Sequence, residues 1–423
     1  MRNIIDIMNL HDGKLFINNI SLFSDLSGIL LIILCYFILF YFLKKNKTIL
    51  LIISFSYFMR ILIMLIGYYL FPLPESLWDS RAFEYYASLN STIAINEIFT
   101  IISTNYLATF YNLLALVYKI TGRSPLVLLA ILNFISVITI IIISNCSYNI
   151  WKSENAKIKT LILLSIMPVN ILYSVSILRE VLIVFFMSLS ILMLINYINS
   201  NRYIYIYLSI FLFSLNIFFH APLLVGLIPI IIIFLIQSFK DLFRGIINGT
   251  LKIAPVFNSI LILFILYSAI LFSWEKAIYS HFITLNIIDQ LVIHAKNTYT
   301  AGASFPLYIL PTNNTELLYL LPLRMIYFLF SPFPWDISKP IHLFGFLDAF
   351  ITLLIFYFLI KNFREIIMNK NSLLLLFIFL SILVIYSLGT GNFGTAIRHK
   401  YKFLFIIIIL TSMFFPNIKF RTK

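Results

Sequence analysis

Long apolar stretches alternate with short polar segments along most of the chain. A helix needs roughly 20 mainly apolar residues to cross a bilayer. This criterion predicts eleven membrane spans, at 27–44, 49–70, 124–150, 158–178, 180–199, 203–219, 221–238, 257–274, 343–360, 372–388 and 401–416. The pattern therefore predicts an all-α polytopic membrane protein.

Two further segments are apolar but are interrupted by polar residues. Residues 96–120 contain Asn112 and Lys119, which favours an amphipathic helix lying at the membrane surface. Residues 317–331 are short and contain Arg324, which favours a re-entrant or interfacial segment, because exposed backbone is not tolerated in lipid. Both are predicted as parts of outer loops.

The composition supports a membrane protein, with 61% hydrophobic and 11% charged residues. A net charge of +14 in a soluble protein would indicate nucleic acid, but here basic residues that hold loops in the cytoplasm explain it, so no nucleic-acid partner is expected. With the loop at 44–47 placed in the cytoplasm, sixteen of the 30 Lys and Arg residues lie inside, against three of the 16 Asp and Glu residues. This orientation puts the N-terminus outside and the C-terminus in the cytoplasm.

The same alternation places two large loops outside, 71–123 and 275–342, each with interfacial or re-entrant segments. The whole chain, 1–423, is expected to form a single transmembrane domain. Its two cysteines, Cys35 and Cys146, lie in apolar runs, which indicates neither a disulfide framework nor a metal cluster.

The most unusual polar segment is GNFGTAIRHKYK at 391–402, in the last outer loop. Arg398, His399 and Lys400 lie close together there, beside two glycines that permit close backbone approach. Such a cationic segment between two spans is typical of an anion site at the bilayer surface. The alternative is an anchor for lipid headgroups, and Lys402 is expected to lie at that level.

Two clusters in earlier outer loops carry ionisable residues that are costly near a membrane. Asp79 is a candidate catalytic base or metal ligand, or alternatively a helix cap, and Glu84 follows one turn later. Arg179 and Glu180 lie where two apolar runs meet. Arg179 would bind phosphate and Glu180 would orient it, unless the two form only a structural ion pair.

Further residues are candidates for substrate contact on the same face. Arg81 follows Asp79, and His220 ends a predicted span. In PFPWD (332–336), two prolines stiffen the backbone, Trp335 suits sugar stacking or an aromatic belt, and Asp336 is a second acid. No spacing of the histidines and acids is typical of a zinc site.

The order of these segments resembles a known group of enzymes. DSRAFEYYA, GRSPLVLLAILN, MPVNILYSVSILRE, PFPWD and NFGTAIRHK, spread over about residues 60–405, are similar to segments of bacterial GT-C-type membrane glycosyltransferases and the related repeat-unit polymerases of O-antigen and capsule assembly. The resemblance implies a GT-C-like fold and assigns the acid of the first outer loop, a base or metal ligand, to Asp79. The paired acid of that family is replaced by Ser80 and Arg81. The chain also ends shortly after its last predicted span, which favours a polymerase-like or small transferase member.

The expected activity is transfer or polymerisation of sugars carried on polyprenyl phosphate or pyrophosphate, at the outer face of a bacterial cytoplasmic membrane. Arg179, Arg398 and Lys400 would stabilise the leaving phosphate, and Asp79 would accept a proton. No cofactor is assigned, and a divalent cation at Asp79 stays open. Membrane lipids and other polysaccharide-assembly proteins are the expected partners. The alternative is a flippase for lipid-linked sugars, which should carry charged residues midway through several helices.

Overall fold

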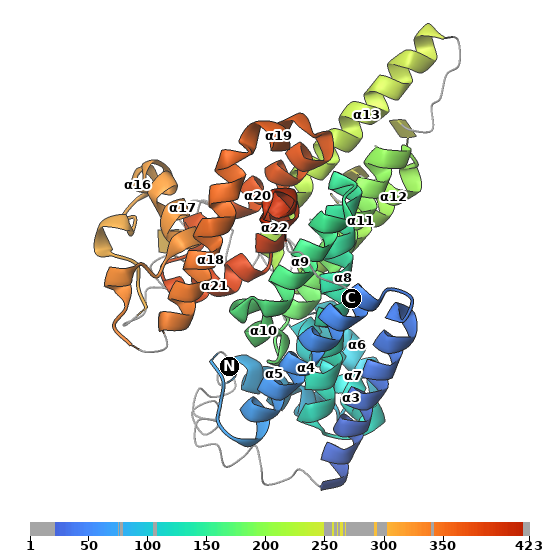
Figure 1. Cartoon of the computed structure of the whole chain (residues 1–423), viewed down its shortest axis with the longest axis vertical. Coiled ribbons are helices and arrows are strands. Elements are labelled where there is room, and N and C mark those ends of the chain that lie inside the picture. The colour runs from blue at the N-terminus through green and yellow to red at the C-terminus, as the bar shows by residue number, and fades with distance from the viewer. Residues whose placement is uncertain are drawn as a thin grey trace. The chain divides into compact units, whose positions relative to one another are not determined.

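The computed structural model describes residues 22–417, except positions 75, 77–78, 105–107 and 340–341 and most of 249–302. The described residues form helices and loops, with one isolated β-bridge between Ser304 and Asn392. They divide into two compact units (Figure 1). Of the described residues, those within 22–192, 218–220 and 408–417 belong to unit 1, and those within 193–217 and 221–407 belong to unit 2.

Seven helices in the described part of the chain are long and apolar enough to cross a membrane. The bent pair α9 and α10 makes an eighth if it is counted as one span. These helices confirm the prediction of a polytopic α-helical membrane protein. Two of the three remaining predicted spans, 203–219 and 401–416, correspond to shorter apolar helices at 203–218 and 404–414. The third, 257–274, lies largely outside the described residues.

Unit 1 is built around a long central helix, α8, which is mostly buried and contacts α3, α4 and α9. Gly28 of α3 lets that helix approach α8, because a Cβ there would lie 2.8 Å from the Cβ of Leu126. The helices of this unit are α3 (Leu22–Leu43), α4 (Lys47–Tyr69), α5 (Asp79–Asn90), α6 (Ile95–Thr104), α7 (Thr109–Thr121), α8 (Pro125–Trp151), α9 (Glu154–Ile166), α10 (Pro168–Ser174) and the first part of α11 (Glu180–Ser200).

The predicted amphipathic helix at 96–120 is two helices, α6 and α7. The second packs on α5, where the amide of Asn90 donates to the buried side-chain oxygen of Asn112 at 2.7 Å. Asn112 thus holds α7 against α5. This packing role could not be predicted from a polar residue within an apolar run.

The two ends of unit 1 differ in chemistry. Tyr68, near the end of α4, donates a hydrogen bond to Asp25, near the start of α3, so these helices are antiparallel. The basic loop 44–47 joins them at the opposite end. At that basic end the indole of Trp151 donates to the carbonyl of Ile409, and Lys159 donates to Phe415. The separation of basic loops from the Asp25 end agrees with the positive-inside pattern.

The span predicted at 158–178 is broken. Helices α9 and α10 meet at an angle of 65°, with Pro168 as the first residue of α10. Proline has no N–H, so the carbonyl of Leu164, four residues earlier, loses its helical donor. Arg60, fully buried within α4, donates to this carbonyl at 3.1 Å and to that of Ser165 at 3.3 Å. The side-chain amide of Asn170 also donates to the Leu164 carbonyl, at 2.5 Å. The charge of Arg60 complements the negative end of the α9 dipole.

This arrangement predicts an energetic coupling between Arg60 and Pro168. Arg60→Met should lower the free energy of unfolding by about 2–4 kcal/mol, because it leaves two buried carbonyls without their charged donor. In a Pro168→Ala background the restored N–H can pair with Leu164, so the same substitution should cost less. Thermal unfolding of the four proteins in detergent measures this coupling, and strictly additive effects would contradict it.

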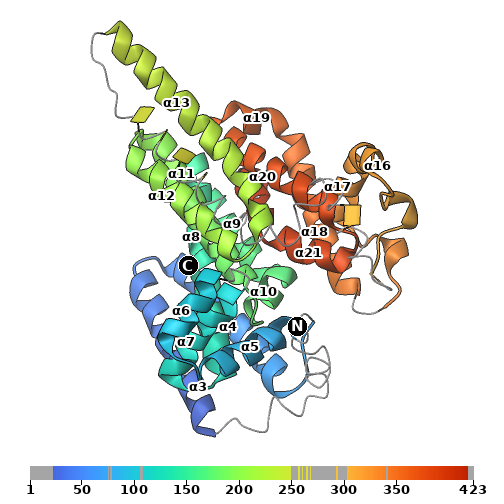
Figure 2. The same cartoon turned by 180° about the vertical axis from the view of Figure 1, so that it is seen from behind.

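Unit 2 is organised around α20, which contacts α13, α17, α19 and α21 (Figure 2). Helix α17, ten residues long, is too short to cross a bilayer, in keeping with the interfacial or re-entrant prediction for 317–331. The helices of this unit are the last part of α11, α12 (Tyr203–Ser214), α13 (Leu227–Ile247), α16 (Asn314–Tyr319), α17 (Leu321–Phe330), α18 (His342–Lys361), α19 (Phe363–Met368), α20 (Lys370–Gly389), α21 (Phe393–Tyr401) and the first part of α22 (Leu404–Thr411).

A second buried arginine caps a helix in unit 2. Arg324 of α17 is fully buried and donates to the carbonyls of Ser387, Leu388 and Thr390 at 2.7–3.0 Å, at the end of α20. A fourth bond, at 2.7 Å, goes to the carbonyl of Ile309. One guanidinium therefore satisfies the last carbonyls of α20 and fixes α17 against it.

Candidate functional site

Unit 1 contains a cavity of about 260 Å³ at the Asp25 end of its helices. The end of α4, the start of α5, the start of α8 and the segment that follows α10 form its walls. Its apolar lining includes Met64, Leu73, Leu129 and Val175. Its polar lining comprises Tyr68, Tyr69, Ser76, Ser80, Arg81 and Ser176. A cavity of this mixed kind suits an amphipathic ligand.

The broken span explains how the cavity arises. The bend at Pro168 brings residues 175–177 to the cavity wall, where the backbone N–H of Ile177 donates to Ser80 Oγ at 2.9 Å. Gly67 lets the loop after α4 fold back, because a Cβ there would lie 2.6 Å from the Leu73 side chain. The predicted polar clusters at 79–84 and 176–180 are thus neighbours, although about a hundred residues separate them.

Arg81 is the charged side chain among the described residues that line the cavity. Its partial burial lowers the pKa of the guanidinium, since desolvation disfavours the charged form. A bound anion would offset that cost. Asp79 lies two residues earlier, exposed in the first turn of α5, where a carboxylate complements the positive end of the helix dipole.

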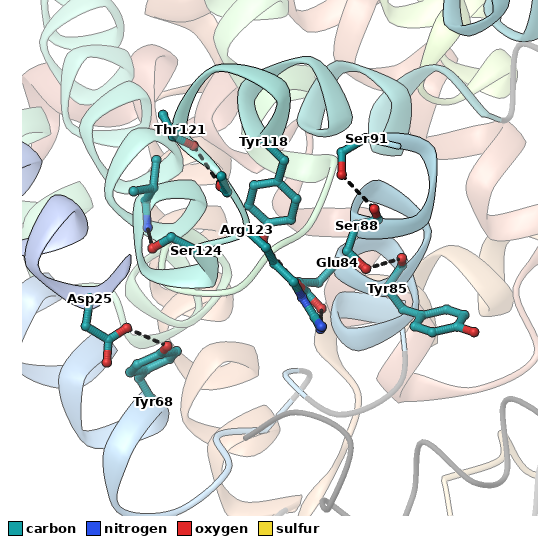
Figure 3. Close-up of polar contacts among 12 residues, drawn as sticks. Asp25, Tyr68, Glu84, Tyr85, Ser88, Ser91, Tyr118, Thr121, Arg123 and Ser124 are labelled. Atoms are coloured by element: carbon teal, nitrogen blue, oxygen red, sulfur yellow. Dashed lines mark hydrogen bonds and ion pairs between the residues drawn. The ribbon is translucent and has the colours of Figure 1, made fainter. Parts of the chain in front are cut away.

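Glu84 occupies a different environment from Asp79 (Figure 3). It is fully buried and accepts hydrogen bonds from Arg123 Nε at 2.9 Å, Arg123 Nη2 at 3.0 Å and the Tyr118 hydroxyl at 3.0 Å. These bonds raise the pKa of Arg123. Both carboxylate oxygens of Glu84 are engaged, so the residue holds α5 against α7 and the start of α8. The geometry gives it a positioning role.

The second cluster also lies in unit 1. Arg179 is half-buried, with its guanidinium carbon 6.0 Å from the centre of the Phe83 ring, a cation–π contact that links it to α5. Glu180 is buried at the first residue of α11, where its charge complements the helix N-terminus. His220 is half-buried beside Phe219, whose ring stacks on Phe186 of α11.

In unit 2, the segment 391–402 is mostly helix α21. Asn392 is its N-cap, with a side-chain oxygen that accepts from the Thr395 N–H at 2.7 Å. Arg398 and His399 are half-buried in its last turn. Lys402 Nζ lies 2.9 Å from His399 Nδ1. An ammonium only donates, so in this contact Nδ1 accepts and the N–H of the neutral ring lies on Nε2.

Lys400 and Lys402 are both buried. Lys400 Nζ lies 2.6 Å from Asp348 Oδ2 of α18 and donates to the Leu329 carbonyl of α17 at 2.9 Å. The expectation that Lys402 lies at the headgroup level was wrong: it is fully buried, with its ammonium 5.5 Å from the centre of the Tyr386 ring. The residues next to Lys402 in the sequence give no sign of this packing against Tyr386.

Trp335 and Asp336 lie in a short 3-10 turn that precedes α18. Trp335 is 72% exposed and stacks on Phe333 with ring centres 4.9 Å apart. Asp336 Oδ2 accepts from the Phe333 N–H at 2.9 Å, which caps the turn, and burial raises the pKa of its carboxyl. The exposed indole leaves an aromatic face available at this end of unit 2.

Sequence reasoning missed several residues that the fold makes prominent. Asp25 accepts hydrogen bonds from Tyr68 and Tyr69, both of which line the cavity. Asp348, in the first third of a predicted span, pairs with Lys400. A charged residue within an apolar run was the available signal for Asp348, as it was for Arg60.

In the described part of the chain, no group of three or more His, Cys, Asp or Glu side chains is arranged to hold a metal ion. Comparisons with family models, with curated proteins and with solved structures find no match for this chain.

Proposed function

We propose that this protein is a membrane-embedded glycosyltransferase or polysaccharide polymerase that acts on sugars linked to polyprenyl phosphate or pyrophosphate. The Arg81 cavity of unit 1 carries the proposal. It joins an apolar wall, suited to a lipid chain, to a single cationic side chain, suited to a phosphate. It opens among helices that are apolar enough to cross a membrane, where a lipid-linked substrate resides.

The proposed reaction breaks the bond between the anomeric carbon of the sugar and the oxygen of the lipid phosphate. The acceptor hydroxyl oxygen attacks that carbon, and the phosphate leaves with the bonding electrons. Asp79, exposed beside the cavity residues Ser80 and Arg81, takes the proton of the hydroxyl. Arg81 and Arg179 offset the negative charge that develops on the phosphate.

Unit 2, considered by itself, carries a separate set of candidate groups. Arg398 and His399 provide donors for an anion at the last turn of α21, and Trp335 provides an exposed ring for a sugar face. Lys400 is assigned no direct role, because Asp348 already balances its charge. The outer face of a bacterial cytoplasmic membrane and partners in surface-polysaccharide assembly belong to the same proposal.

If Arg398 binds phosphate through its planar guanidinium, a lysine with the same charge should not replace it. Arg398→Lys keeps the charge but loses the planar fork that grips two oxygens, so activity should fall by about ten- to a hundredfold. Lys339→Ala is the control, since Lys339 is an exposed cation that precedes α18. Initial rates of sugar transfer measure both. Equally mild effects would mean that α21 only anchors headgroups.

A lipid-linked sugar flippase is the second candidate, favoured by the broken span α9–α10. Discontinuous helices often form transport sites. Arg60 at that break, however, is engaged by backbone carbonyls, and Asp348 in α18 is paired with Lys400. These two charges thus have structural partners, which favours the transferase.

One assay separates these functions. Purified protein in proteoliposomes is supplied with oligosaccharide linked to polyprenyl pyrophosphate. Chain growth identifies a polymerase, and addition of one sugar to an acceptor identifies a single-step transferase. Movement of the lipid-linked sugar across the bilayer without new glycosidic bonds would overturn the proposed function in favour of a flippase.

A further inference from the structure

The Arg81 cavity has a second polar wall, formed by Tyr68 and Tyr69 at the end of α4. Asp25 Oδ1 accepts from the Tyr68 hydroxyl at 3.0 Å, and Asp25 Oδ2 accepts from the Tyr69 hydroxyl at 3.2 Å. Figure 3 shows the bond between Asp25 and Tyr68. Each oxygen of the carboxylate thus holds one phenol in place.

These bonds determine what the two phenols can offer to a ligand. A phenol has one proton to donate, and both protons are directed to Asp25. What remains on each hydroxyl oxygen is acceptor capacity. Ser76 of the same lining likewise directs its proton, to the Leu73 carbonyl at 2.7 Å. This wall therefore matches a ligand rich in O–H donors and repels phosphate oxygens.

The Arg81 wall has the opposite character, because a guanidinium only donates and is attracted to anions. One cavity thus combines a wall of acceptors with a cationic donor. The two tyrosine rings, whose centres are 4.7 Å apart in an edge-to-face arrangement, add aromatic surface of the kind that packs on the C–H face of a sugar.

We propose that Tyr68 and Tyr69, held by Asp25, form a glycosyl subsite that binds the hydroxyls of the transferred sugar while Arg81 binds the phosphate of the lipid carrier. This inference rests on the proposed function and deepens it. It divides the cavity into a sugar end and a phosphate end, and it gives Asp25 a positioning role that acts through the two tyrosines.

The test is a binding measurement on the full chain in lipid nanodiscs. The probes are polyprenyl phosphate and polyprenyl phosphate that carries one hexose. The wild-type protein should bind the hexosyl lipid about tenfold more tightly, as expected for one or two added hydrogen bonds. Tyr68→Phe removes an acceptor, so this preference should fall to about threefold or less.

Asp25→Asn is the second variant, nearly identical in size. The amide offers one acceptor and an N–H₂ donor, so one phenol oxygen must accept from residue 25 and has less acceptor capacity left for a ligand. The sugar preference should fall again. Arg81→Gln should weaken both lipids to a similar degree, by about tenfold. Tyr85→Phe, on α5 outside the cavity lining, is the matched control and should keep the preference.

The outcomes separate the subsite from the function. If Tyr68→Phe and Asp25→Asn leave the preference unchanged, or weaken the bare lipid as much as the hexosyl lipid, the glycosyl subsite is overturned and the proposed function stands. If the wild-type protein binds neither lipid, the proposed function fails and the subsite falls with it.

Discussion

Lys400→Met is expected to prevent accumulation of the folded protein. The substitution leaves the carboxylate of Asp348 buried without its partner, since both side chains of the pair are at most 1% exposed. Loss of one member of a buried ion pair costs about 3–5 kcal/mol, a large part of the stability of a typical domain. Yield of monodisperse protein in detergent, together with its melting temperature, measures the loss.

The reciprocal change distinguishes a structural lysine from a substrate ligand. In the double variant Lys400→Met with Asp348→Leu, apolar side chains replace both charges, so folding should recover. Activity should recover with it, because Lys400 contacts Asp348 and the Leu329 carbonyl and is proposed to make no contact with substrate. A double variant that folds normally but stays inactive would restore Lys400 to the phosphate-binding role expected from the sequence.

Asp79→Asn is expected to abolish product formation while the protein folds normally. The amide keeps the size of the side chain but cannot take a proton, and a positioned base contributes about 10²–10⁴-fold to a rate. Asp79 is exposed in the first turn of α5, so the cost to stability should stay within about 1 kcal/mol. Single-turnover rates with lipid-linked donor give the comparison.

Glu97→Gln supplies the matched control. Glu97 is also an exposed acid in the first turn of a helix of the same loop, α6. The substitution makes the same chemical change at a site away from the cavity lining. It should leave the rate unchanged. Near-normal product from Asp79→Asn would return Asp79 to the alternative role of a helix-end charge.

The helical, membrane-spanning character of the chain was predictable because it depends on apolar runs that are longer than a bilayer is thick. The break at Pro168 was not predicted. Proline within an apolar run is compatible with a kinked span, and only the three-dimensional structure shows Arg60 at the freed carbonyl. Hydropathy records the length of a run but does not record where its backbone hydrogen bonds go.

The candidate site was predicted in part. Asp79, Arg81 and Arg179 were recognised because charged residues are rare in this chain, and the fold places them around one end of unit 1. The sequence could not distinguish Glu84, whose carboxylate forms an ion pair with Arg123, from Asp79, which is exposed. The environment of Glu84 depends on its contact with Arg123, which lies 39 positions later in the sequence.

The Asp25 wall was missed for a related reason. Tyr68 and Tyr69 are ordinary aromatic residues at the end of a span, and Asp25 lies 43 positions before Tyr68. The chemistry appears only when the antiparallel packing of α3 and α4 directs two phenol protons to one carboxylate. The periodicity of apolar residues predicts where helices lie. It does not predict which side chains act as hydrogen-bond donors or acceptors, because that depends on their partners in the folded structure.

Photo-crosslinking tests most directly whether the Arg81 cavity is where a lipid-linked sugar binds. The probe is a polyprenyl phosphate hexose with a diazirine on the isoprene nearest the phosphate. We expect crosslinks in peptides that contain Met64–Leu73 and Val175–Ile177, competed by unlabelled hexosyl lipid and greatly reduced in Arg81→Gln. Crosslinks confined to exposed apolar residues of α3, such as Phe37 and Phe42, and unaffected by competitor would contradict binding in the Arg81 cavity.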